Sequence, residues 1–156
     1  MTYCVAMRLA DGLVFASDSR TNAGFDQIST FRKMHVFEQP GERELVILSA
    51  GNLATSQSVI SLLEKRAGSE DPNVFSTASM FETAEVVGRT IREVIHRDNP
   101  EGKVNHVDFS CSLILGGQIR GEQVRLFNIY PEGNFIEATE ETPYFQIGES
   151  KYGKPI

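Results

Sequence analysis

Thr2 is the residue near the start of the sequence whose position invites a chemical explanation. It follows the initiator methionine directly, so removal of Met1 would leave one residue with both a hydroxyl and a free α-amine. The amine, with a pKa of about 8, can act as general base for the hydroxyl of the same residue, through a water molecule. The β-branch of threonine restricts χ1 and so directs the oxygen. Thr2 is therefore a candidate nucleophile for acyl transfer.

A carboxylate and a cation are expected to tune this nucleophile. Asp18 interrupts the apolar pattern of the segment LVFAS, and a buried carboxylate without a partner is costly. Lys33 in the segment FRKMHVF is the favoured cation, and Arg20 and Arg32 compete with it. An ammonium beside Thr2 would favour the alkoxide and the neutral amine, and Asp18 would keep that ammonium charged and oriented.

Each of these residues also has an ordinary structural explanation when it is taken alone. Thr2 can simply permit methionine removal, Asp18 can end a strand, and Lys33 can be a solvated charge on an edge strand. Their combination with a terminal threonine favours chemistry. Backbone N–H groups around Ser49 to Gly51 are candidate oxyanion donors, because Gly51 precedes a predicted helix N-terminus.

The elements that must position these residues are short strands, then two helices, then more strands. Strands are predicted over 1–9, 13–18, 33–38, 44–49, 109–115, 124–130, 135–138 and 144–147, with a loop over 19–30. Apolar residues at helical spacing predict helices over 52–66 and 79–96. Gly116 and Gly117 are expected in a hairpin turn. Because strands and helices do not alternate, we expect an α+β fold, a mostly antiparallel layered domain.

The first hairpin is expected to turn through the three residues 10–12, with Leu9 opposite Leu13. Cys4 would then lie opposite Asp18, and Thr2 would be a diagonal neighbour of Asp18. One face of the hairpin would carry Tyr3, Val5, Met7, Leu9, Leu13 and Phe15 as core, and the other face would carry Thr2, Cys4, Ala6, Val14, Ala16 and Asp18.

Composition excludes several classes of function. The 156 residues carry a net charge of −6, which argues against nucleic-acid binding, and no apolar run is long enough to cross a membrane. The three histidines are scattered without metal-ligand spacing, so neither a metal nor a cofactor is expected. Cys4 and Cys111 form no zinc or redox motif, Cys4 is expected to serve packing, and a reducing, cytoplasmic setting is expected.

The order and spacing of four segments resemble proteasome-type N-terminal nucleophile hydrolases, and most closely their bacterial ancestral β-subunit branch. These segments are Thr2 with its following strand, ASDSR with Asp18, FRKMHVF with Lys33, and SAGNLAT with Gly51. The resemblance spans the whole chain and implies an αββα four-layer sandwich of two antiparallel sheets between helix layers. It also implies one proteasome-subunit-like domain over 1–156 whose C-terminal part is missing.

The resemblance assigns roles as well as a fold. It implies hydrolysis of a peptide or amide substrate by Thr2, with Lys33 and Asp18 as described and Gly51 as oxyanion donor. Ser150, in the segment GES, is a further site candidate. The family also implies a homo-oligomer with a ring-like assembly, and leaves any unfoldase partner open. Two other functions are weighed: a catalytically silent assembly or scaffold subunit of the same fold, and an unrelated ligand-binding α+β module.

Overall fold

Ten strands and two α-helices follow one another along the described part of the chain. The computed structural model describes residues 2–22, 28–102 and 106–149. The strands are β1 (Tyr3–Leu9), β2 (Gly12–Ser17), β3 (Arg20–Asn22), β4 (Ile28–Thr30), β5 (Met34–Gln39), β6 (Arg43–Gly51), β7 (Cys111–Ile119), β8 (Arg125–Ile129), β9 (Phe135–Glu137) and β10 (Tyr144–Gly148). The helices are α1 (Leu53–Lys65) and α2 (Met80–Asp98), followed by a 3-10 turn η1 (Pro100–Gly102). The α+β class and both predicted helices are confirmed.

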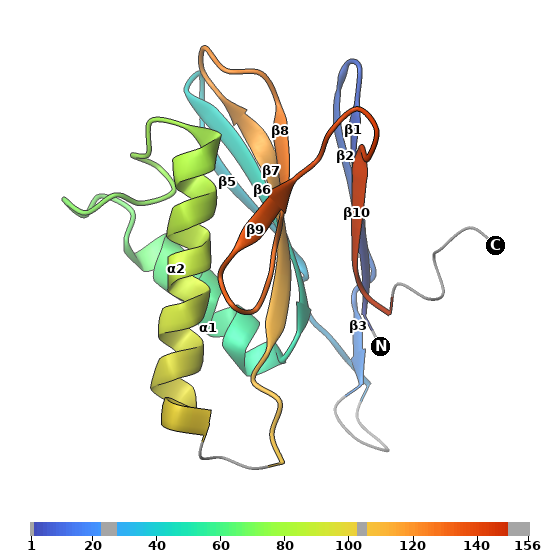
Figure 1. The fold of residues 1–156 in the computed structure, drawn as a ribbon, viewed down its shortest axis with the longest axis vertical. Helices are drawn as coiled ribbons and strands as arrows, with labels where there is room; N and C mark the ends of the chain where they lie inside the picture. Colours follow the sequence, from blue (N-terminus) through green and yellow to red (C-terminus); the bar gives the residue numbers. More distant parts are fainter. Residues whose placement is uncertain (1, 23–27, 103–105, 150–156) are drawn as a thin grey trace.

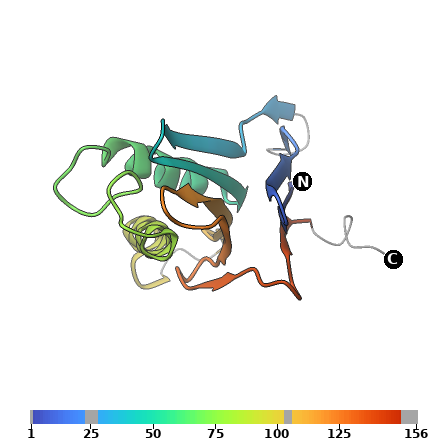
Figure 2. The same cartoon turned by 90° about the horizontal axis from the view of Figure 1, so that it is seen from above.

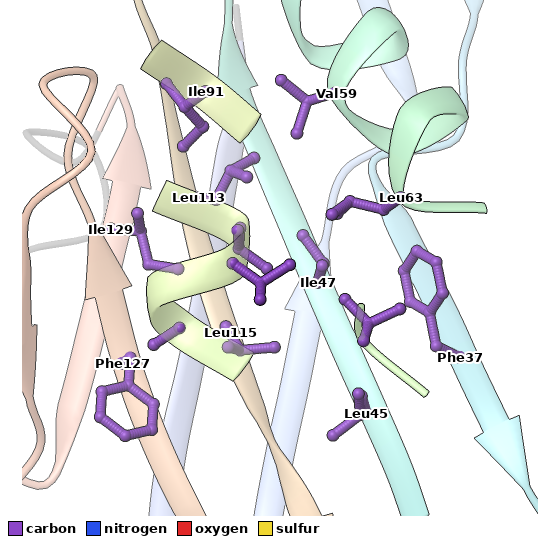
Figure 3. Packing of buried hydrophobic residues seen from close by; sticks show 14 of the residues in the cluster. Phe37, Leu45, Ile47, Val59, Leu63, Ile91, Leu113, Leu115, Phe127 and Ile129 are labelled. Atoms are coloured by element: carbon purple, nitrogen blue, oxygen red, sulfur yellow. The ribbon is translucent and has the colours of Figure 1, made fainter. Parts of the chain in front are cut away.

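A five-stranded sheet carries the main core. Its strands lie in the order β5-β6-β7-β8-β9, and every neighbouring pair is antiparallel. Both helices cover one face of this sheet (Figure 1). Ile47, Leu113 and Leu115 from the sheet meet Val59 and Ile91 from the helices in one apolar cluster (Figure 3). Burial of this cluster fixes the course of β6 and the point at which α1 begins.

A three-stranded antiparallel sheet, in the order β10-β1-β2, lies against the other face of the five-stranded sheet (Figures 1 and 2). Cys4, Ala6 and Ile147 from its inner face form a second cluster with Leu48 and Ile114. The central strands β6 and β7 are therefore covered on both faces. Their nearly continuous apolar runs follow from this, although the strands are antiparallel.

The predicted register of the first hairpin is wrong by one residue. Leu9 pairs with Gly12 rather than with Leu13, and Cys4 therefore lies opposite Ser17 rather than opposite Asp18. The turn contains two residues instead of three. A shift of one residue moves one strand's side chains to the opposite face relative to the other strand.

The predicted core face of β1 is also wrong. The inner face carries Cys4 and Ala6, and Ala6 lies opposite Phe15, so a small residue shares the space with a large one. The alternate residues face outward, and Met7 is 38% and Leu9 is 53% exposed. The large side chains of β2 and of the neighbouring sheet fill the inner space, so β1 needs only small residues there.

Gly116 and Gly117 do not form a turn, as had been predicted; they lie inside β7, which continues to Ile119. A Cβ at Gly116 would come within 2.7 Å of the Phe15 ring, and a Cβ at Gly117 would overlap the backbone of Glu44. These glycines thus permit close packing between strands and between sheets.

The described residues form three layers: the helices, the five-stranded sheet and the three-stranded sheet (Figure 1). Within these residues no helix covers the outer face of the three-stranded sheet, so the αββα arrangement is seen in part. The segment 19–30, predicted as a loop, contains the paired short strands β3 and β4, while residues 23–27 lie outside the described part. Neither described helix has the length and apolarity that crossing a bilayer requires.

Candidate functional site

Thr2 is held at the very start of β1 by the end of β10. It is half-buried, and its carbonyl oxygen accepts a hydrogen bond from the Glu149 N–H at 2.6 Å. Gly148 lies opposite Tyr3 and has a φ of +86°. A Cβ on Gly148 would overlap the carbonyl oxygen of Thr2, so only glycine permits this approach. The backbone of Thr2 is therefore fixed from one side by β10.

Asp18 fixes the backbone of the same segment from the other side. It follows β2 and faces Tyr3: its N–H donates to the Tyr3 carbonyl at 3.1 Å, and its Oδ1 accepts from the Tyr3 N–H at 2.8 Å. The carboxylate thus binds the backbone of the residue that follows Thr2. These contacts join Asp18 to the residue that follows Thr2, in a register different from the expected one.

Lys33 is the cation that pairs with Asp18. Its Nζ donates to Asp18 Oδ2 at 2.8 Å and to the carbonyl oxygen of Arg20 at 2.6 Å. The side chain of Lys33 is only 5% exposed, while that of Asp18 is 35% exposed. Of the three cations weighed from the sequence, Arg20 contributes only its backbone to this contact, and Arg32 is exposed.

The electrostatics of the pair keep Asp18 ionised. Burial by itself would raise the pKa of the Asp18 carboxyl, but hydrogen bonds from Lys33 and from the Tyr3 N–H outweigh it and hold the pKa below its ordinary value. A carboxylate with both oxygens engaged is a rigid support for the ammonium of Lys33. The group can therefore present a fixed positive charge beside the start of β1.

Cys4 is a buried residue of β1 that contacts β6 near this group. The side chain is fully buried, and its thiol donates to the carbonyl oxygen of Ser49 at 3.6 Å. Burial raises the pKa of Cys4 to about 12, and the nearby charge of Asp18 adds to the shift while Lys33 opposes it. Cys4 is fully buried in the apolar cluster between the two sheets, so the prediction that it serves packing is confirmed.

Gly51 ends β6 and precedes α1. It has a φ of +107°, and a Cβ would come within 2.6 Å of the Ser110 carbonyl oxygen. Asn52 caps α1 by accepting a hydrogen bond from the Thr55 N–H at 3.0 Å. The contact between Cys4 and Ser49 joins β1, near its start, to β6, near its end. Both ends lie toward the same end of the two sheets (Figure 1).

The segment after Gly51 makes a second contact that was not predicted from the sequence. Asn52 Nδ2 donates to the carbonyl oxygen of Asp108 at 2.8 Å, and the Asn52 N–H donates to the carbonyl oxygen of Ser110 at 2.9 Å. Asp108 Oδ1 in turn accepts from the Ser110 N–H at 2.8 Å. Asn is a preferred N-cap residue, and Asp two residues before Ser is typical of an Asx turn. Nothing in the sequence indicated that the two would meet.

Hydrogen bonds thus join Lys33 to Asp18, and Asp18 to Tyr3, the residue that follows Thr2. Met1 and Ser150 lie outside the described residues. A cavity of about 870 Å³ lies at the other end of β1, around the turn after Leu9. None of the predicted site residues lines it.

No protein-family model matches the chain, and no curated protein matches it. Among solved structures, Anbu (ancestral beta-subunit) from Yersinia bercovieri is 66% identical, with a TM-score of 0.91 over 98% of this chain and 63% of that one. The helical assembly of the Anbu complex from Pseudomonas aeruginosa is 56% identical, with a TM-score of 0.91 over 97% of this chain and 62% of that one. An Anbu (Gly-1) mutant from Hyphomicrobium sp. strain MC1 is 52% identical, with a TM-score of 0.90 over 99% of this chain and 63% of that one.

These similarities extend over nearly the whole sequence, and the chain spans less than two thirds of the length of the solved relatives that it matches. They agree with the fold described above. The chain belongs to the Anbu family of ancestral β-subunits, a branch of the proteasome-like N-terminal nucleophile hydrolases.

Proposed function

We propose that this protein is a threonine-type N-terminal nucleophile hydrolase that cleaves peptide or amide bonds. One observation carries the proposal: the Asp18 carboxylate joins the backbone next to Thr2 to the buried ammonium of Lys33, at 2.8 Å on each side. A fixed cation beside a threonine at the start of a strand is the arrangement that activation of its hydroxyl needs.

In the proposed reaction, removal of Met1 gives Thr2 a free α-amine. The neutral amine takes the hydroxyl proton, and Oγ1 attacks the carbonyl carbon of the substrate. The resulting oxyanion is stabilised by the Gly51 N–H. The carbon–nitrogen bond then breaks, and the leaving amine takes the proton held by the Thr2 amine. Water, activated by the same amine, hydrolyses the ester and regenerates the hydroxyl.

The test combines intact mass with covalent labelling. Purified protein should lack Met1, and a peptidyl β-lactone should add one acyl group to Thr2. Thr2→Ala should abolish labelling, whereas Thr2→Ser should keep it. A protein that retains Met1, or that is labelled equally in the Thr2→Ala variant, would refute the proposed nucleophile.

A catalytically silent assembly subunit is the second candidate, and it is favoured by the solved Anbu complex that forms a helical assembly. In both cases we expect this chain to form homo-oligomers, ring-like or helical, and analytical ultracentrifugation of the purified protein measures this. A monomer at high protein concentration would contradict the expected assembly. An oligomer that is not labelled at Thr2 would favour the silent subunit.

We also propose that residues 1–156 are part of one larger domain whose further residues complete the αββα sandwich. The outer face of the three-stranded sheet supports this, because Val14 and Tyr144 are each 43% exposed there beside Met7 and Leu9. Apolar side chains gathered on one sheet face are typical of a surface that another layer covers. The cytoplasm is the proposed location, since Cys4 and Cys111 are both buried free thiols.

A further inference from the structure

The segment that joins β6 to α1 is clamped to the segment that enters β7. Asn52 uses three groups at once: its Oδ1 accepts from the Thr55 N–H, its Nδ2 donates to the Asp108 carbonyl, and its N–H donates to the Ser110 carbonyl. Only the first of these bonds caps the helix. The other two tie the residue after Gly51 to a segment more than 50 residues away in the sequence.

The segment that receives Asn52 is itself fixed by a side chain. Asp108 accepts from the N–H of Ser110 at 2.8 Å. The Ser110 side chain and N–H both donate to it, and these bonds hold the pKa of the Asp108 carboxyl below its ordinary value. The turn therefore presents the carbonyl groups of Asp108 and Ser110 in a defined orientation toward Asn52.

The direction of the Gly51 N–H follows from the hydrogen bonds of β6. The Ser49 N–H donates to the Lys33 carbonyl at 2.9 Å, and residues two apart on an antiparallel strand direct their N–H groups to the same side. The Gly51 N–H is therefore directed toward the side of Lys33, whereas the Asn52 N–H points to Ser110. Gly51 has a φ of +107°, and its backbone lies against the Ser110–Cys111 segment, which Asn52 also binds.

We propose that Asn52 and Asp108 are positioning residues that hold the Gly51 N–H in place as the oxyanion donor for Thr2. This inference rests on the proposed function. Neither residue touches the substrate in this proposal. Asn52 sets the peptide that follows Gly51, and Asp108 holds the turn to which Asn52 binds.

The test separates helix capping from positioning. Asn52→Ser keeps an N-cap oxygen but is too short to reach the Asp108 carbonyl. Asp108→Ala removes the acceptor for Ser110, and Asp108→Asn retains one. Ser79→Ala is the matched control, because Ser79 caps α2 in the same way, by accepting from the Glu82 N–H.

Acylation of Thr2 by a peptidyl β-lactone gives kinact and KI for each variant. Losing an oxyanion donor costs about 10²–10³-fold in rate, and we expect a displaced donor to cost about tenfold. Asn52→Ser and Asp108→Ala should thus lower kinact about tenfold with KI unchanged, while Asp108→Asn and Ser79→Ala should stay within about twofold of the unchanged protein. Equal kinact in Asn52→Ser and Ser79→Ala would overturn the proposal, as would Asp108→Asn behaving like Asp108→Ala.

Hydrogen exchange distinguishes failure of this inference from failure of the proposed function. The clamp predicts faster exchange of the Asn52 amide in Asn52→Ser and Asp108→Ala but not in Ser79→Ala. If the unchanged protein is not acylated, the hydrolase proposal fails, and the positioning role proposed for Asn52 and Asp108 fails with it. If it is acylated while exchange and kinact remain unchanged in the variants, only the positioning role is overturned.

Discussion

Removing either partner of the ion pair between Asp18 and Lys33 should have unequal effects on stability. Asp18→Asn removes the carboxylate that pairs with the Lys33 ammonium, which is 5% exposed. Breaking a fully buried pair costs about 3–5 kcal/mol. Because the Asp18 side chain is 35% exposed, we expect a smaller loss in the free energy of unfolding, about 2–3 kcal/mol. Lys33→Met leaves a carboxylate that water can reach, and should cost only about 1 kcal/mol.

Urea unfolding followed by circular dichroism, at one fixed protein concentration, measures these losses. The double variant Asp18→Asn/Lys33→Met has no uncompensated buried charge, so its stability should lie close to that of Lys33→Met alone. For a chain of 156 residues, the Asp18→Asn loss corresponds to a drop in Tm of about 5–10 °C. Equal losses in the two single variants, or a double variant as unstable as their sum, would refute the reasoning.

Three further predictions concern Gly148, pH and the buried thiol. Gly148→Ala should destabilise more than Gly41→Ala, because both glycines have positive φ but only Gly148 is pressed against Thr2; the urea midpoints of the two variants measure the difference. The pKa of Asp18 is lower in the folded protein than its ordinary value, so its contribution to stability is present at neutral pH and is lost as pH falls below about 4. Between pH 3 and 7, the free energy of unfolding should therefore change less with pH in Asp18→Asn than in the unchanged protein. The Cys4 thiol, with a pKa of about 12 and no exposure, should react with a thiol reagent at pH 8 only after unfolding, and fast reaction in the folded protein would contradict its burial.

The sequence was sufficient for elements whose signal is periodic and local. Both helices were predicted from apolar spacing, and each begins after a residue that accepts an N-cap hydrogen bond, Asn52 and Ser79. The strands β6 and β7 were visible as apolar runs. Where β7 ends could not be predicted, because Gly116 and Gly117 are typical of turns unless one knows that Phe15 and Leu45 pack against them.

The hairpin shows why a face assignment needs more than alternation. A turn of two residues and a turn of three residues both fit the segment around Asp11, and they place opposite faces of β2 beside β1. The larger side chains of β1, Met7 and Leu9, suggested the core face. The inner space is instead filled by Phe15 from β2 and by the neighbouring sheet, which no property of β1 reveals.

The residue types of the candidate site could be predicted, but the hydrogen bonds that hold those residues in place could not. A cation beside Asp18 could be predicted from the sequence, because a carboxylate at that position needs one. Lys33 was the favoured partner, with Arg20 and Arg32 as competitors, and the structure selects Lys33. That Asp18 would bind the Tyr3 N–H, and that Asp108 would receive Asn52, depends on strand pairing between distant segments. Contacts of this kind carry no local pattern.

The unequal cost of the two substitutions bears on the choice between a hydrolase and a silent subunit. If Lys33→Met costs little stability, the fold does not need the ammonium, because a methionine of similar length fills the same space. Asp18 then supports the fold through its two hydrogen bonds to Tyr3, whereas Lys33 adds a buried charge that packing alone does not require. A subunit that served only assembly would gain nothing from keeping that charge near the start of β1. A small loss in Lys33→Met together with complete loss of acylation would therefore favour the hydrolase, and a large loss would favour a structural role for the pair.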